Sequence, residues 1–261
     1  MKSRVNALPV IAILVYAFLW LPVVILVLFS FSGNKFGIRW EGFTLRWYLE
    51  LLQNVAAKGA LKRSLFIALV TTVVTTVGGT LSAYGLFKFR FRGKGLLRLT
   101  ILLPIVLPYI VTGAALLTFF TRVARIPLGY PSIIIAHITF SLPLTVFVVL
   151  ARMQRIDWTL EAAAMDLGAD RVTTFTKVIG PLLLPGIIAS AVLVFPWSFN
   201  DFVITYFVAG VGSTTLPIYI FSQLRYGVSP VINTIGTIFV GVTAISLLLG
   251  GSLLGEESPF K

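Results

Sequence analysis

The sequence contains no cysteine and a single histidine, His137. Disulfide bonds, thiolate metal sites and cysteine nucleophiles are therefore excluded, and most other metal or nucleophile schemes lack the ligands or bases they need. The phosphate-binding pattern Gly-x-x-x-x-Gly-Lys-Ser/Thr is missing, as are His-Glu-x-x-His and Gly-x-Ser-x-Gly. We therefore expect no catalytic residue, no metal site and no cofactor in this chain, and no ATP hydrolysis by the chain itself.

Charge is also scarce. Charged residues make up 11% of the chain and hydrophobic residues 57%, whereas a soluble domain carries roughly 25% charged residues. A membrane-spanning helix needs about 20 mostly apolar residues. Runs of that length lie at about residues 8–31, 64–87, 99–121, 132–151, 182–208 and 230–254. They predict an all-α membrane protein with six transmembrane helices in one domain, residues 1–261. The first run is too long for a typical signal-peptide core and is expected to remain as a span.

Acidic residues are outnumbered by basic ones, 9 against 21. The basic residues between the second and third runs lie together without an acid: Lys88, Arg90, Arg92, Lys94 and Arg98. Such clusters stay on the cytoplasmic side of a membrane. The net charge of +12 therefore indicates topology and not a nucleic-acid partner. We predict that both termini and the loops near residues 90 and 165 are cytoplasmic, and that the loops near 45, 126 and 220 are outside.

One polar stretch, residues 157–181, predicts two short helices between apolar runs. Asp157 or Thr159 can cap the first helix, Gly168 can end it in the left-handed conformation, and Asp170 can cap the second. Pro181 is expected to stop the second helix where the fifth apolar run begins. Two interpretations remain open: a helical knob that sits in a groove of another protein, or an ordinary capped loop between two spans.

Asp201 is the only acidic residue well inside a predicted span. A carboxylate is costly there and should face the interior, paired with a neighbour or with a transported cation. Trp197 and Tyr206 could offer aromatic faces to such a cation. The alternatives are an aspartate in a wet outer vestibule, or one hydrogen-bonded to a neighbouring helix. His137 is expected to be a neutral side chain hydrogen-bonded between helices, because its own span offers no further titratable group for a proton relay.

The 157–181 stretch resembles the cytoplasmic EAA loop of ABC importer permeases. Gly168 and Pro181 are in register with that loop, but Ala162 occupies the usual glutamate position and Glu161 lies one residue earlier. One residue is about 100° around a helix, so Glu161 is not expected to inherit the contacts of the family glutamate by position. Further segments match at 42–48, 89–94, 198–204, 215–219 and 227–233. Together they resemble the second permease subunit of spermidine/putrescine-type ABC importers.

The resemblance implies the type I permease fold of ABC importers and a place in the bacterial inner membrane. It implies four kinds of partner: a related second permease, two cytoplasmic ATPase subunits that bind ATP and Mg, an extracytoplasmic solute-binding protein, and lipid. The residues expected to couple transport to the ATPase are Glu161, Ala163, Asp166, Leu167, Gly168, Ala169 and Pro181. The residues expected along the substrate path are Asp201, Trp197, Asn200 and Tyr206.

A polyamine is the solute that the resemblance favours. In polyamine members, two adjacent acids often occupy the positions held here by Asn200 and Asp201, so this chain has one acid fewer. Another small solute remains an alternative. A channel or secondary transporter that works without ATP is a further alternative, but it would need more intramembrane charges than Asp201 and His137 provide.

Overall fold

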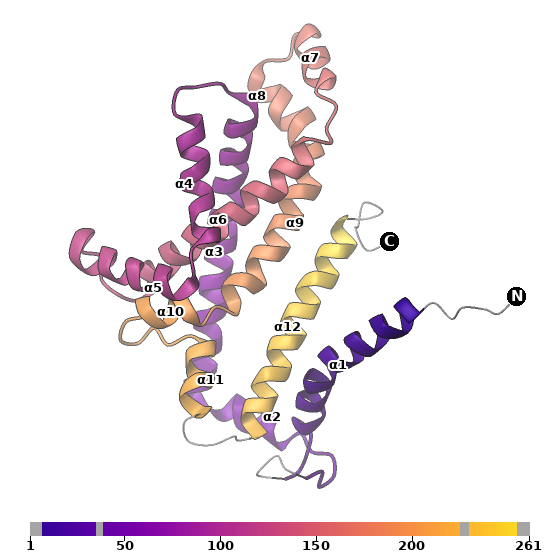
Figure 1. Cartoon of the computed structure of the whole chain (residues 1–261), viewed down its shortest axis with the longest axis vertical. Coiled ribbons are helices and arrows are strands. Elements are labelled where there is room, and N and C mark those ends of the chain that lie inside the picture. The colour runs from indigo at the N-terminus through magenta and orange to yellow at the C-terminus, as the bar shows by residue number, and fades with distance from the viewer. Residues whose placement is uncertain (1–6, 35–38, 225–229, 255–261) are drawn as a thin grey trace, which may run out of the picture. The chain divides into compact units, whose positions relative to one another are not determined.

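The computed structural model describes residues 7–34, 39–224 and 230–254, and within them every regular element is helical (Figure 1). An isolated antiparallel bridge joins Ser32 to Phe43. Both termini, which the topology argument predicts to be cytoplasmic, lie outside the described residues, as do residues 227–229 of the matching segment 227–233. The chain divides into two compact units, residues 1–59 with 219–241 and residues 60–218 with 242–261.

The first unit contains α1 (Ala7–Phe29), α2 (Arg46–Gln53) and the beginning of α3 (Val55–Lys88). The segment between α1 and α2 is tightly organised. The indole Nε1 of Trp47 donates to the carbonyl of Ser32 at 2.7 Å, and the Phe31 ring stacks on Phe43 and on Tyr48. Asn54 donates to the Tyr219 hydroxyl at 3.1 Å, which ties the end of α2 to α11 (Leu216–Leu224). The unit also includes the first part of α12 (Pro230–Leu254).

The second unit carries α4 (Lys94–Val106), α5 (Tyr109–Thr118), the π-helical turn η1 (Phe119–Val123) and α6 (Tyr130–Met153). They are followed by α7 (Thr159–Asp166), α8 (Arg171–Thr174), the π-helical turn η2 (Phe175–Ile179), α9 (Gly180–Phe199) and α10 (Val203–Val208). The end of α3, the start of α4, and α7 lie at one end of this unit, whereas α5 and α10 lie towards the other (Figure 1). α6 packs along α9, and α5 packs along α10.

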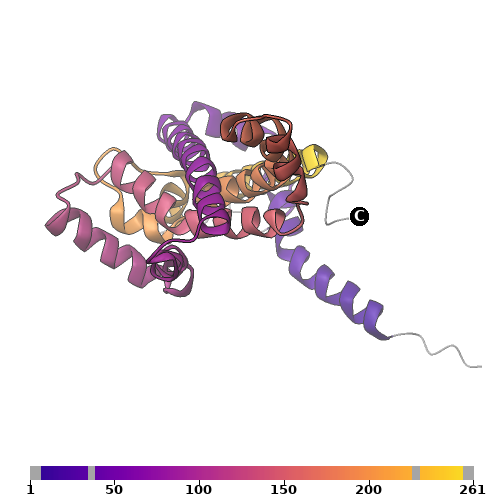
Figure 2. The same cartoon turned by 90° about the horizontal axis from the view of Figure 1, so that it is seen from above.

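The third predicted span is not a straight helix. Among the described residues, five helices are long and apolar enough to cross a membrane, and a sixth span exists only if α4 and the α5–η1 segment count as one despite a bend of 114°. In Figure 2, α4 is seen nearly end-on while α5 runs across the view. The bend falls at Leu107, whose backbone is extended (ψ 136°). Pro108 disfavours the helical conformation in the residue before it and lacks an N–H, so the helix ends there.

The expectation that Pro181 stops a helix is wrong. Helix α8 continues through η2 into α9, and residues Arg171–Phe199 form one continuous span. In η2 the Gly180 N–H donates to the carbonyl of Phe175, five residues earlier. This wider turn separates the proline ring from the carbonyl that it would meet in a regular α-helix, so the chain passes Pro181 without breaking.

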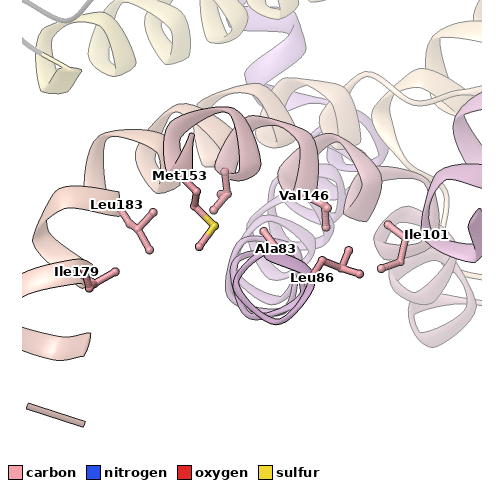
Figure 3. Close-up of a cluster of buried hydrophobic side chains, with 8 residues drawn as sticks. Ala83, Leu86, Ile101, Val146, Met153, Ile179 and Leu183 are labelled. Carbon is pink, nitrogen blue, oxygen red and sulfur yellow. The ribbon is translucent and has the colours of Figure 1, made fainter. Parts of the chain in front are cut away.

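The core of the second unit near α7 draws on five helical segments (Figure 3). Its buried side chains are Ala83, Leu86, Ile101, Val146, Val149, Met153, Ile179 and Leu183. Lipid chains are as apolar as these side chains, so close packing and not the hydrophobic effect holds such helices together within a bilayer. The close approach of α5 to α10 illustrates this, because a Cβ on Gly113 would lie 2.5 Å from the Phe207 ring.

Candidate functional site

A break in the helix separates α9 from α10. α9 ends at Phe199 and α10 begins at Val203, so the predicted run 182–208 is not one helix. The Asp201 carboxylate oxygen Oδ2 accepts hydrogen bonds from the Thr205 N–H at 2.8 Å and from the Thr205 hydroxyl at 2.7 Å. A short acidic side chain that bonds to backbone N–H groups in this way favours the start of a new helix. Asp201 is therefore a structural part of the break.

His137 of α6 joins the same network. Its ring nitrogen Nδ1 lies 2.7 Å from the Ser198 hydroxyl, and Nε2 lies 2.9 Å from the Thr205 hydroxyl and 3.4 Å from Asp201 Oδ2. The side chains of His137 and Asp201 are 1% and 5% exposed. The expectation that His137 is hydrogen-bonded between helices is confirmed. The nearby acid was missed, because it comes from another span.

Counting donors and acceptors shows which group donates in each hydrogen bond of this network. The Thr205 hydroxyl has one proton, and a carboxylate can only accept, so the hydroxyl donates to Asp201 and accepts from His137 Nε2–H. For a neutral ring, Nδ1 then accepts from the Ser198 hydroxyl. Each buried polar atom in this chain of bonds has a partner, which offsets the cost of placing polar groups in the membrane.

An open pocket of about 490 Å³ lies beside the break. Its lining residues are Tyr109, Leu193, Pro196, Trp197, Asn200, Asp201, Phe202 and Val203. Three of the four residues predicted along the substrate path therefore meet here. Tyr206 is outside this set. Its side chain is exposed, and its ring packs 5.5 Å from Phe202. A carboxylate among tryptophan and tyrosine rings can receive an organic cation.

Tyr109 was not among the predicted site residues. It is the first residue of α5 and directly follows Pro108, the N-cap residue after the bend. Irregular backbone at membrane depth is tolerated only when it is buried in protein or lines a cavity. Pro108 in the sequence could therefore have indicated that the next residue, Tyr109, lies where the backbone lines a cavity.

The 157–181 stretch follows its predicted signals at Gly168 and Asp170, but the expectation that Asp157 or Thr159 caps the first helix is wrong, because the N-cap residue of α7 is Trp158, which makes no side-chain cap bond. Asp157 accepts from the Thr159 N–H at 3.0 Å and from its hydroxyl at 2.8 Å, and these bonds hold the pKa of Asp157 below its ordinary value. Gly168 has φ +89°, the left-handed conformation expected for a helix-ending glycine. Asp170 accepts from the Thr173 N–H at 3.0 Å, and its hydrogen bonds to Thr173 lower the pKa of Asp170.

The residues predicted to couple transport to an ATPase differ in exposure. Ala163, Asp166, Leu167 and Gly168 are exposed, with Leu167 90% exposed, and Pro181 is also exposed. Ala169 is half-buried. Glu161, by contrast, is buried and forms an ion pair with Lys88 at the end of α3. The exposed surface of α7 is therefore mostly apolar, and Glu161 faces away from it towards α3.

Comparison with known proteins places this geometry in a family. Residues 75–254 match the model of the family described as "Binding-protein-dependent transport system inner membrane component". The chain is 36% identical to the spermidine/putrescine transport system permease protein PotC of Escherichia coli K12, over 93% of this chain and 91% of that protein. It is 38% identical to the putrescine transport system permease protein PotI of the same organism, over 90% and 86% of the two chains.

Solved structures share the fold. A bacterial ABC transporter that imports the acidic polysaccharide alginate matches with a TM-score of 0.74 and 17% identity, over 95% of this chain and 93% of that one. The inward-facing methionine ABC transporter MetNI matches with a TM-score of 0.63 and 14% identity, over 81% and 98%. The chain belongs to the inner-membrane permeases of binding-protein-dependent ABC importers, and its fold is the one those permeases share.

Proposed function

We propose that the solute carried along this permease is a polyamine of the putrescine or spermidine class. The relatives named above are polyamine permeases, and they match this chain over nearly its whole length. The observation that carries the proposal is the pocket at the α9–α10 break, where Asp201 lies with Trp197 and Tyr109. A protonated amine can pair with the carboxylate while the rings replace part of its water shell.

Binding at this pocket should be weak, as transport requires. Asp201 Oδ2 already accepts two hydrogen bonds from Thr205, so only part of the carboxylate's capacity is left for a passing ammonium group. The neighbouring Asn200 is neutral and is itself hydrogen-bonded to Thr243 at 3.3 Å. One fixed negative charge suits one amine at a time, and a dication would not be trapped.

The chain would act with partners. We propose a heterodimer with a related permease, two cytoplasmic ATPase subunits that bind ATP and Mg, and an extracytoplasmic solute-binding protein. The exposed surface of α7 and Gly168 would dock on an ATPase subunit, because it presents apolar side chains such as Leu160, Met165 and Leu167 outside the membrane spans. This orientation makes both termini cytoplasmic.

ATP-dependent uptake tests the proposal. The complete transporter, assembled in proteoliposomes with its binding protein, should accumulate radiolabelled putrescine or spermidine only when ATP is present on the ATPase side. Uptake that is unchanged without ATP would indicate a channel or a secondary transporter. ATP-driven uptake of a neutral or anionic solute, with no uptake of either polyamine, would reject the polyamine assignment while keeping the importer.

A further inference from the structure

The ion pair between Glu161 and Lys88 joins two parts of the chain that are 73 residues apart. Glu161 belongs to the first turn of α7, and Lys88 is the last residue of α3. The Glu161 side chain is 11% exposed and that of Lys88 is 37% exposed. The pair is therefore shielded from solvent on the glutamate side, where a charge without a partner would be unfavourable.

Trp158 completes the arrangement. The Lys88 ammonium lies 5.1 Å from the centroid of the Trp158 ring, within range of a cation–π interaction. The Phe87 ring also stacks on Trp158, with the ring centroids 4.9 Å apart. The indole Nε1 donates to the carbonyl of Met153, the last residue of α6, at 3.0 Å. Lys88 thus contacts a carboxylate on α7 and a ring anchored to α6.

These side chains continue into the core near α7. Phe87 and Trp158 pack against the cluster of Figure 3, which includes Leu86 and Met153. A displacement of α7 would therefore act on the end of α3 through the ion pair, and on the packed core through Trp158.

We propose that Lys88, Glu161 and Trp158 form a clip that transmits movement of α7 to α3, with Glu161 as a positioning residue inside this chain. The clip rests on the proposed coupling function of the α7 surface. In this proposal Glu161 contacts Lys88 and not the ATPase, and the ATPase contacts the exposed side of α7. The position where the resemblance expects a glutamate is held by Ala162, which is exposed.

A double-mutant cycle tests the clip in the complete transporter with its binding protein. The variants are Lys88→Met, Glu161→Gln and the two combined. Each single variant should lower the amount of solute imported per ATP hydrolysed by about fivefold or more, while the complex assembles and basal ATP hydrolysis continues. The combined variant should be no worse than either single one, because both changes remove the same interaction. Lys88→Arg keeps the positive charge and the contact with the Trp158 ring, so this variant should retain much of the coupling.

The control is Arg92→Met, which removes an exposed positive charge from the same basic loop and should leave the coupling ratio unchanged. A direct contact of Glu161 with the ATPase predicts a different pattern: Glu161→Gln would uncouple transport, Lys88→Met would not, and the combined variant would behave like Glu161→Gln. That pattern, or unchanged coupling in all variants, would overturn the clip. Gly168→Val separates the two proposals. If it uncouples transport while the clip variants do not, the α7 surface remains the coupling element and only the clip fails.

Discussion

The substitution Asp201→Asn tests the carboxylate at the helix break most directly. Asparagine keeps the size of the side chain and an oxygen that can accept both bonds from Thr205, now 2.8 and 2.7 Å long. A hydrogen bond to a charged group contributes about 1.5–3 kcal/mol and a neutral one about 0.5–1.5 kcal/mol. The variant should therefore lose roughly 1 kcal/mol per bond, which a folded domain of ordinary stability tolerates.

The effect on transport should be larger. An ammonium group about 5 Å from the carboxylate, at an effective dielectric constant of about 20, gains about 3 kcal/mol of Coulomb energy. The Asp201 carboxylate already accepts two hydrogen bonds from Thr205, so about half of this Coulomb energy should be available to the solute. Because 1.4 kcal/mol is about a factor of ten, uptake of putrescine should fall about tenfold. Asp201→Glu should keep part of the activity.

The assay is uptake of radiolabelled putrescine by cells whose only polyamine importer is this one, normalised to the amount of permease in the membrane. Thr205→Val is the matched control, because it removes the hydroxyl bond to Asp201 and keeps the charge. Unchanged uptake in Asp201→Asn would refute the argument. Equal losses in Asp201→Asn and Thr205→Val would show that the carboxylate matters only for the structure of the break.

Three further predictions use other parts of the chain. Gly168→Val should leave the subunit in the membrane but abolish uptake, since the backbone angle φ of +89° costs a side-chain-bearing residue about 1–2 kcal/mol. The control Gly95→Val, where a Cβ would lie in open space, should remain active. Full uptake with solute-stimulated ATP hydrolysis in Gly168→Val would contradict the coupling role. His137→Phe takes away the His137 partner of the Ser198 hydroxyl, at about 1–3 kcal/mol, and leaves the Thr205 hydroxyl bonded to Asp201 alone. The melting temperature of the purified complex should therefore drop, and an unchanged value would argue against the network. In intact cells, an impermeant thiol reagent should label Phe43→Cys, which replaces an exposed side chain, and not Arg92→Cys; labelling of Arg92→Cys from outside would overturn the topology.

Local signals gave the correct local structure. Gly168 and Asp170 act within a few residues of themselves, through a left-handed turn and a helix cap, so their roles can be predicted from the sequence. Proline was less predictable. Pro108 follows the end of a helix, but Pro181 does not end one, because the π-helical turn before it makes room for the ring. Whether such a turn forms depends on packing around it, which the sequence pattern does not specify.

The sequence by itself determined the class of the protein, because apolar runs of membrane-spanning length and a shortage of charge leave a helical bundle in lipid as the only stable solution. It also singled out Asp201, because an acid is costly in such a run. Only the tertiary structure decided the partners of the charged groups. His137 meets Ser198 across 61 residues of sequence, and Lys88 meets Glu161 across 73. Contacts of that kind depend on which helix faces lie against each other, and a periodic apolar pattern along one chain does not define this.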